Sequence, residues 1–314
     1  MSFNTNAQLD PSQVEDQRGS GGRFGGGLGG GLPVGRGGGP GMVIGGGGLG
    51  MVLLVVMLLL GVNPFGGGES YPDTPYQQPV QSQAQSQAEG GPSVQDCRTG
   101  ADANRRDDCR IVGFVNSIQS YWGQEFQRHG QQYAQAPMVL FSGQTQSGCG
   151  FASEAQGPFY CPIDKKVYLD LTFFQELQQR FGAKGGPFAQ GYVVAHEYGH
   201  HVQDMLGLLD EGGASTRGAQ GSSVRTELQA DCLAGVWARH AAETGFLQAP
   251  SDQELADAMD AAAAVGDDRI QRQTQGRVVP ESFTHGTSQQ RVQWFKNGYG
   301  SGAIEGCNTQ GGRV

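Results

Sequence analysis

The chain has 314 residues, 37% of them hydrophobic and 16% charged, which is enough for one sizeable domain or two small ones. Its 54 glycines are far above the usual share, and most of the excess precedes residue 69, so the remainder has the composition of a globular domain with a buried core. A net charge of −9 and a pI near 5.1 argue against a nucleic-acid or anionic-membrane surface, which needs clustered Lys and Arg, so no nucleic-acid partner is expected.

Composition divides the chain into four parts. Residues 1–41 are polar and then glycine-rich, with too little apolar area to offset the entropy of ordering, so we expect a disordered tail. An apolar segment, residues 42–62, follows. Residues 63–93 are rich in Gln, Ser and Pro and lack hydrophobic periodicity, which predicts a flexible linker. The folded domain is expected over residues 94–314.

The apolar segment Met42–Val62 has the length of a transmembrane helix, about 20 residues without a charge. A signal peptide is the alternative, because Gly45 to Gly48 weaken its start, but no clear small-residue cleavage site follows, which favours an uncleaved anchor. Three arginines precede the segment, and no Lys or Arg follows it until Arg98. The sequence therefore predicts a single-pass protein of the cell membrane with a cytoplasmic amino terminus and an extracytoplasmic domain.

Cysteine usage agrees with export of the domain. An even number of cysteines suits disulfide formation in an oxidising compartment. The six are Cys97, Cys109, Cys149, Cys161, Cys232 and Cys307. Six cysteines allow fifteen connectivities, but the first two and the next two close short loops, which leaves the last two for each other. Buried free thiols are the alternative.

Hydrophobic periodicity predicts a mostly helical domain with a small sheet, an α+β fold. Pro187 is suited to open a helix, capping boxes begin at Ser251 and Thr287, and Gly245 is suited to end a helix. The expected helices lie around Phe114–Phe126, from Pro187 to Leu206, from Ser222 or Ser223 to Thr244, and after Ser251 and Thr287, and the expected strands are Met138–Phe141 and Val167–Leu171.

The helix that follows Pro187 carries the motif His196-Glu197-x-x-His200. The two histidines are four residues apart, so their imidazoles lie one turn apart on one face, spaced to share a metal ion. Glu197 is rotated by about 100° from His196, which keeps it from binding the metal but near the water that a catalytic zinc activates. The alternative is a solvated helix face, but the neighbouring residues are apolar and indicate a buried helix.

A catalytic zinc site needs a third protein ligand, and the next predicted helix offers one. Glu227 and Asp231 share a face of that helix, and small residues beside them allow the two helices to approach closely. We expect Glu227 to complete the ligand set of one Zn²⁺ per chain. We expect Asp231 to accept a hydrogen bond from the free ring nitrogen of a ligand histidine. The alternative is an exposed pair of carboxylates.

The sequences HEYGHH and ELQADCLAGVWA together resemble the bacterial putative neutral zinc metallopeptidase family and, more broadly, the gluzincin metalloproteases. In gluzincins the third zinc ligand is a glutamate on a second helix, followed four residues later by an aspartate, and Glu227 and Asp231 match this pattern. The resemblance to the narrower family covers nearly the whole chain, including the glycine-rich amino terminus and the segments around Cys149, Pro158, Asp267 and His285. It implies a zincin-like fold and peptidase activity, and it implies no particular substrate.

His285 is the only histidine after the helix that carries Glu227, and it lies in a Thr-, Gly- and Ser-rich loop before the last predicted helix. A zincin benefits from a hydrogen-bond donor beside the metal that stabilises the oxyanion of the transition state, and we expect His285 to be this donor. The alternative is a loop histidine that anchors the last helix by hydrogen bonding.

The leading hypothesis is a membrane-anchored zinc endopeptidase that hydrolyses a peptide or protein substrate, with Glu197 as general base. The strand Lys166–Leu171 precedes the metal helix and is expected to bind extended substrate by strand addition, with a plain core strand as the alternative. The rival hypothesis is a tethered, non-catalytic binding or assembly protein with a structural zinc site.

Overall fold

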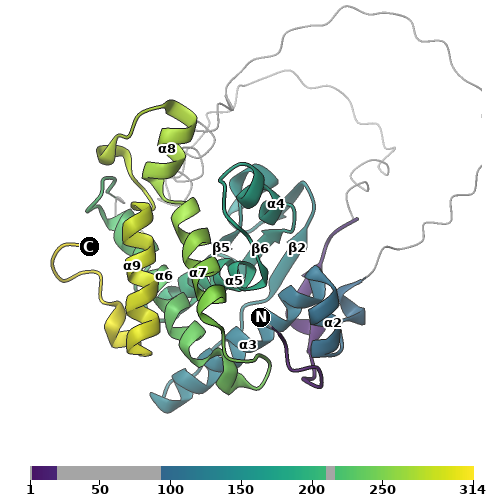
Figure 1. Cartoon of the computed structure of the whole chain (residues 1–314). Coiled ribbons are helices and arrows are strands. Elements are labelled where there is room, and N and C mark those ends of the chain that lie inside the picture. Colours follow the sequence, from purple (N-terminus) through teal and green to yellow (C-terminus); the bar gives the residue numbers. More distant parts are fainter. Residues whose placement is uncertain (1, 20–92, 210–215) are drawn as a thin grey trace, which may run out of the picture.

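The computed structural model describes residues 2–19, 93–209 and 216–314 (Figure 1). In this part of the chain the α-helices are α2 (Gly100–Arg105), α3 (Asp107–Arg128), α4 (Phe173–Gln179), α5 (Pro187–Met205), α6 (Ser222–His240), α7 (Asp252–Ala264), α8 (Asp267–Gln275) and α9 (Ser288–Ser301). The strands are β1 (Val14–Asp16), β2 (Met138–Phe141), β3 (Gln144–Ser147), β4 (Gly150–Ser153), β5 (Phe159–Cys161) and β6 (Lys166–Asp170), and short 3₁₀ turns include η4 (Ala241–Thr244) and η6 (Ile304–Cys307). The α+β prediction is thus confirmed for the described residues.

The helix starts follow the local signals in the sequence. Pro187 occupies the first turn of α5, and the hydroxyls of Ser251 and Thr287 accept hydrogen bonds from backbone N–H groups at the starts of α7 and α9. The start of α6 differs from the prediction, because its N-cap is Gly221 and neither serine caps it. Its end is tightened into η4, and Gly245 follows in the left-handed conformation.

Helix α5 is the centre of the fold, with the sheet on one side and α6, α7 and α9 on the other (Figure 1). Small residues allow this close packing. A Cβ atom on Gly199 of α5 would lie 2.9 Å from the carbonyl oxygen of Ala230 in α6, and one on Gly298 of α9 would lie 1.8 Å from the carbonyl oxygen of Cys232. The backbone of α6 therefore lies close to those of α5 and α9, which brings side chains of all three helices to one place.

The main sheet has the order β1-β2-β6-β5, with β1, β2 and β6 parallel and β5 antiparallel to β6. Strand β6 is therefore an interior strand, flanked by β2 and β5. The prediction that Lys166–Leu171 binds substrate by strand addition is wrong, because its backbone groups already pair on both sides. The core-strand alternative holds, since four of the five residues of β6 are buried.

The amino-terminal residues 2–19 fold against the rest of the described structure, so the prediction of a disordered tail over residues 1–41 is wrong for this part of it, and residues 20–41 lie outside the described residues. Strand β1 pairs with β2, and Phe3 is 2% exposed, with its ring against Phe114. A Cβ atom on Gly113 would lie 2.3 Å from the Phe3 ring, so α3 has room for this side chain because of a glycine. Since residues 2–19 and the domain over 94–314 form one body, a membrane between them is excluded, and the predicted topology is wrong.

The expected transmembrane anchor is also not supported. Among the residues that the structure describes, no helix is long and apolar enough to cross a membrane. The segment Met42–Val62, to which the span was assigned, lies outside the described residues, as does the expected linker 63–93 apart from Ser93. The fold class is corrected accordingly: it is an α+β fold in which neither the transmembrane helix nor the single-pass location is supported.

The three predicted disulfides are confirmed. Cys97 is bonded to Cys109, Cys149 to Cys161 and Cys232 to Cys307. The third bond joins α6 to η6 across 75 residues of sequence, so it fixes the carboxy-terminal segment to the helix that carries Glu227.

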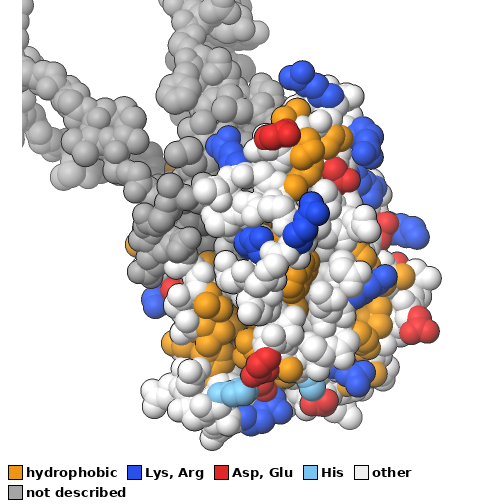
Figure 2. All heavy atoms as spheres, turned by 90° about the vertical axis from the view of Figure 1, so that its left-hand side faces the viewer, with side chains coloured by type: hydrophobic (Ala, Val, Ile, Leu, Met, Phe, Trp, Pro, Cys, Tyr) orange, Lys and Arg blue, Asp and Glu red, His pale blue; other side chains and the backbone are white. Residues whose placement is uncertain are grey.

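The side of the molecule on which α8 and α9 lie carries charges of both signs (Figure 2). Its Lys and Arg side chains stand apart from one another, with acidic, hydrophobic and uncharged side chains between them. Over the described residues seen in Figure 2, this face therefore shows no patch of a single sign that would steer a charged partner.

Candidate metal centre

His196 and His200 project from the same face of α5, with their ring centroids 4.9 Å apart. Most of α5 is buried, which is why its sequence is apolar on several sides around the motif. His196 is 7% exposed, and His200 is half-buried. The predicted helical spacing of the two imidazoles is therefore present.

Glu227 of α6 faces both imidazoles. Its carboxylate oxygens lie 3.1 Å from Nε2 of His196 and 3.6 Å from Nε2 of His200. The potential ligand atoms of the three residues all lie within 4.8 Å of one another. Ligand atoms about 2.0–2.1 Å from a tetrahedral zinc are separated by about 3.3 Å, so this set of two imidazoles and one carboxylate fits Zn²⁺ with little rearrangement.

The second nitrogen of each imidazole has an oxygen acceptor. Nδ1 of His196 lies 2.8 Å from Oδ1 of Asp231, and Nδ1 of His200 lies 2.8 Å from Oε1 of Gln203. Gln203 is itself fixed, because its amide donates to the backbone oxygen of Thr226 at 2.8 Å. With Nδ1–H donating in both rings, the lone pair of each Nε2 faces Glu227, which is the tautomer that a metal ligand requires.

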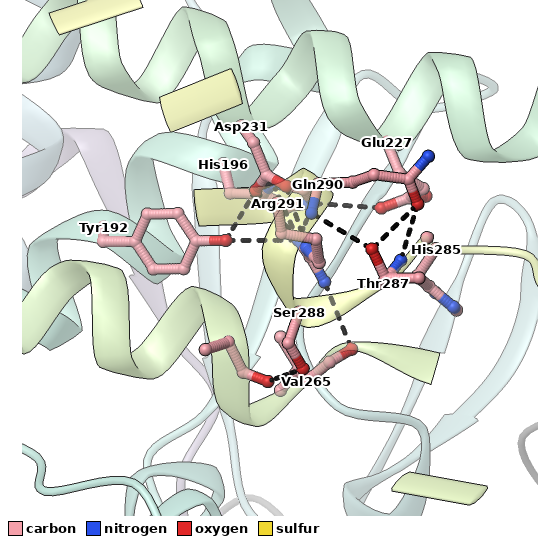
Figure 3. Close-up of polar contacts among 12 residues, drawn as sticks. Tyr192, His196, Glu227, Asp231, Val265, His285, Thr287, Ser288, Gln290 and Arg291 are labelled. Atoms are coloured by element: carbon pink, nitrogen blue, oxygen red, sulfur yellow. Dashed lines mark hydrogen bonds and ion pairs between the residues drawn. The ribbon is translucent and has the colours of Figure 1, made fainter. Parts of the chain in front are cut away.

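Asp231 belongs to a buried charge network behind His196 (Figure 3). Arg291 of α9 donates to both of its carboxylate oxygens, from Nε at 2.8 Å and Nη2 at 2.9 Å, and the Tyr192 hydroxyl donates to Oδ1 at 2.5 Å. Burial alone would raise the pKa of Asp231, but Arg291 and His196 lower it to about 2. Asp231 therefore stays ionised and holds the His196 ring in place.

The Glu227 carboxylate also stays ionised. Burial works against the charge, but the nearby imidazoles of His200 and His285 hold the pKa of Glu227 well below its usual range. For Glu197 the balance is opposite. It is 8% exposed, and burial raises its pKa above the ordinary value. A glutamate with a raised pKa is a better proton acceptor, and it lies near Glu227, whose carboxylate is kept anionic as a metal ligand would need to be.

The loop that carries His285 is held by Asp267 at the start of α8. One oxygen, Oδ2 of Asp267, accepts backbone N–H bonds from Thr284, His285 and Gly286 at 2.7, 2.6 and 2.9 Å. Nδ1 of His285 lies 3.5 Å from the other oxygen, Oδ1. Burial opposes protonation, but the charges of Glu227 and Asp267 raise the pKa of His285. The structure thus brings His285 to the same cavity as the predicted ligands and also fixes its loop.

A cavity of about 260 Å³ runs along the face of α5 that carries the predicted ligands, and its lining includes Tyr192, His196, Glu197, His200, Glu227, His285 and Arg291. Helix α4 and its C-cap residue add two charged side chains, Glu176 and Arg180. Much of the remaining lining is apolar and includes Pro158, Phe159, Phe173, Phe181, Leu209, Val265 and Ile270. A largely apolar cavity with a few convergent polar groups is the usual form of a small-ligand or peptide site.

Four residues of this centre had no role in the sequence analysis: Tyr192, Gln203, Asp267 and Arg291. Tyr192 and Gln203 lie within one turn of His196 and His200 on the same helix, so helical spacing alone could have suggested them. Arg291 comes from an element 60 residues away from Asp231, and its sequence signals are its place six residues after His285 and its position in line with the buried Phe295 on α9.

An HExxH helix joined by a glutamate on a second helix defines a candidate zinc hydrolase site. The family comparison agrees with this class. The chain belongs to the family described as "putative neutral zinc metallopeptidase", whose model matches residues 4–310.

Two relatives show how far the similarity extends. The uncharacterized protein YpfJ of Escherichia coli (strain K12) is 41% identical over 309 residues, 96% of this chain and 96% of the relative. The uncharacterized protein Rv2575 of Mycobacterium tuberculosis (strain ATCC 25618 / H37Rv) is 50% identical over 259 residues, 80% of this chain and 84% of the relative. No solved structure matches the chain.

Proposed function

We propose that this protein is a zinc-dependent peptidase that holds one Zn²⁺ per chain with His196, His200 and Glu227. The observation that carries the proposal is the meeting of these three side chains within 4.8 Å at a cavity that Glu197 and His285 also line. The three proposed ligands by themselves support only metal binding. Glu197, His285 and the cavity beside them support catalysis as well.

Zinc bound at such a site lowers the pKa of water and polarises a carbonyl group. Glu197 then acts as the general base: it takes a proton from the attacking water and passes it to the leaving amine. Its raised pKa suits both steps, because a strongly acidic carboxylate accepts a proton poorly. Glu197 lies one residue after His196 on α5, so the metal helix itself fixes where the proton is accepted.

His285 is proposed as the donor that stabilises the developing oxyanion of the substrate carbonyl. Asp267 holds its backbone through three hydrogen bonds, which limits reorganisation during the reaction. The neighbouring carboxylates Glu227 and Asp267 raise the pKa of His285 above its ordinary value, which shifts its ring toward the protonated, donating form.

The substrate is proposed to be a peptide that places an apolar side chain against the wall formed by Phe159, Phe173 and Phe181. Two features support this. These aromatic side chains and the proposed ligands line one cavity, and β5, which contributes Phe159, is an edge of the main sheet. An extended peptide can therefore pair with β5, the role that the sequence analysis had assigned to β6.

The rival function is a non-catalytic protein with a structural zinc. Structural zinc sites usually have four protein ligands and no open position. Among the residues that the structure describes, three potential ligands meet here, at a cavity large enough for a substrate side chain. This arrangement favours catalysis.

The test is elemental analysis of the purified protein together with hydrolysis of a diverse peptide library. We expect one zinc per chain, cleavage that stops on chelation and returns with added zinc, and a Glu197→Gln variant that keeps the zinc but cleaves nothing. Stoichiometric zinc without cleavage of any peptide would establish the rival function. Cleavage that survives Glu197→Gln would contradict the proposed mechanism.

A further inference from the structure

A chain of hydrogen bonds joins α5 to β5 on a different side of the helix from the metal centre. The hydroxyl of Tyr160, on β5, donates to Oδ2 of Asp204 at 2.5 Å, and Nδ1 of His201 lies 3.1 Å from the same hydroxyl oxygen. Nε2 of His201 in turn lies 2.7 Å from the backbone oxygen of Ala134. His201 directly follows the predicted ligand His200 on α5.

All three side chains are removed from solvent. Tyr160 is 6% exposed and His201 0%, and the side chain of Asp204 is 6% exposed. Burial and the bond to Asp204 raise the pKa of Tyr160, so its hydroxyl keeps its proton and remains a donor. A short hydrogen bond from a buried hydroxyl to a carboxylate is among the stronger ones in proteins, so this link restrains the strand.

The hydrogen bonds of Tyr160 are made to the same helix, α5, that provides the predicted ligands His196 and His200. His196 and His200 project from α5 into the cavity, whereas His201 and Asp204 project from α5 toward β5. Tyr160 lines the same cavity as the two predicted ligands. In the part of the chain that the structure describes, the hydroxyl of Tyr160 makes the direct hydrogen bonds between β5 and α5.

The other described connections of β5 do not join it to α5. Its backbone pairs with β6, and Cys161 is bonded to Cys149, which lies in the turn of the β3-β4 hairpin and also lines the cavity. The direct link between β5 and α5 is made by the hydrogen bonds of Tyr160, and beside it Nζ of Lys165, in the turn from β5 to β6, lies 3.8 Å from Oδ2 of Asp204.

We propose that Tyr160, held by His201 and Asp204, is a positioning residue that sets the cavity wall β5 against the metal-binding face of α5 for recognition of the peptide substrate. This inference rests on the proposed peptidase function and adds to it the element that controls peptide affinity. Loss of the Tyr160 hydroxyl leaves the ring and the metal ligands in place but loosens β5. Peptide binding should weaken while zinc binding stays unchanged.

The chain offers a matched control in Tyr168 on β6. Its hydroxyl donates to Oδ2 of Asp164 at 2.6 Å, and it is 3% exposed, but it does not line the cavity. Tyr160→Phe and Tyr168→Phe therefore each remove one hydrogen bond from a buried tyrosine to an aspartate, and Tyr160→Phe also removes the contact with Nδ1 of His201. We expect Tyr160→Phe to raise KM for a cleaved peptide by about 3- to 10-fold, with kcat within about twofold and zinc content unchanged. Tyr168→Phe should leave KM and kcat unchanged.

Asp204 allows a rescue experiment. Asp204→Asn keeps an oxygen that accepts the bond from Tyr160, whereas Asp204→Ala removes it. A positioning role predicts that KM rises more for Asp204→Ala than for Asp204→Asn. Equal effects of the two substitutions would overturn the proposal.

Two further measurements do not depend on turnover. Tyr160→Phe should weaken a peptidyl hydroxamate, which contacts the cavity wall, but not acetohydroxamate, which contacts only the zinc. It should also speed amide hydrogen exchange at Phe159–Cys161 in the metal-free protein, and Tyr168→Phe should not. If wild type cleaves no peptide, the proposed function fails, and the exchange experiment still decides the positioning role. Unchanged exchange at β5, or equal weakening of both hydroxamates, would overturn the inference.

Discussion

The guanidinium of Arg291 and the carboxylate of Asp231 form a two-bonded ion pair, with side chains that are 4% and 0% exposed. This pair ties α9 to α6 directly behind His196. Asp231 also accepts hydrogen bonds from Tyr192 and from His196, so this one carboxylate orients the ring of a predicted zinc ligand. The buried charge is tolerable because Arg291 neutralises it, and the pair therefore links the stability of the fold to the geometry of the metal centre.

Replacing Arg291 by Ala is predicted to leave the Asp231 charge buried and unpaired. A loss of about 3–5 kcal/mol in the free energy of unfolding is expected. Zinc binding should also weaken, because Asp231, which accepts the hydrogen bond of the His196 ring, is no longer held in place by Arg291. Urea denaturation and zinc titration measure the two effects. Arg272→Ala, an exposed arginine of α8, is the control and should change the free energy of unfolding by less than about 0.5 kcal/mol. A fully stable Arg291→Ala protein with normal zinc affinity would show that the pair is dispensable.

Zinc content and turnover together distinguish a predicted ligand, Glu227, from Asp231, which is predicted only to orient a ligand. Glu227→Ala, which removes a ligand, is expected to lose the metal, whereas Asp231→Asn should lose roughly 10- to 100-fold in zinc affinity or activity, as is usual for a residue that orients a ligand. Elemental analysis and peptide hydrolysis provide both numbers. Full zinc occupancy in Glu227→Ala would mean that the third ligand is wrong.

For His285 the expected result is a turnover about 10²-fold lower in His285→Ala, with zinc content unchanged, if it stabilises the oxyanion. His129→Ala, at an exposed histidine of the α3 carboxy terminus, serves as the control. The competing interpretation is that His285 only anchors the loop before α9. Normal turnover combined with a lower melting temperature would support that interpretation alone.

The parts of the centre that follow helical spacing were predictable from the sequence. The relative positions of His196, Glu197 and His200 follow from their spacing on one helix. The position of Glu227 beside them could be predicted because the small residues next to it on the second helix allow that helix to approach the first. The three disulfides followed from the short loops that the first two of them close. The contact of Arg291 with Asp231 could not be predicted from helical spacing, because it depends on how α9 packs against α6 and not on a local sequence pattern.

The amino-terminal segment shows the same limit on the scale of the fold. Residues 2–19 contain few apolar side chains, and local composition therefore predicts disorder. Phe3 is nevertheless buried, because α3 offers a gap at Gly113, and Val14 pairs with Met138. These contacts depend on residues more than 100 positions away, so the segment itself has no hydrophobic periodicity from which they could be predicted.

Arg18 is predicted to make the attachment of this segment sensitive to acid. Its guanidinium pairs with Asp16 at 2.7 Å and with Asp108 at 3.0 Å, and it thereby joins the end of β1 to α3. Burial would raise the pKa of both carboxyls, but the bonds from their arginine partners keep each pKa below its ordinary value of 3.8.

Because the folded-state pKa values are depressed, the stabilising contribution of these carboxylates is present above about pH 4 and is lost as the pH falls through the folded values. Arg18→Gln should therefore lower the free energy of unfolding by about 1–3 kcal/mol at pH 7, and its difference from wild type should shrink below about pH 4. Urea denaturation of both proteins between pH 7 and 3 measures this difference. Arg105→Gln is the control, because Arg105 is 71% exposed and its pair with Asp102 should contribute little at any pH. A difference between wild type and Arg18→Gln that stayed constant down to pH 3 would show that the ion pairs do not hold the segment.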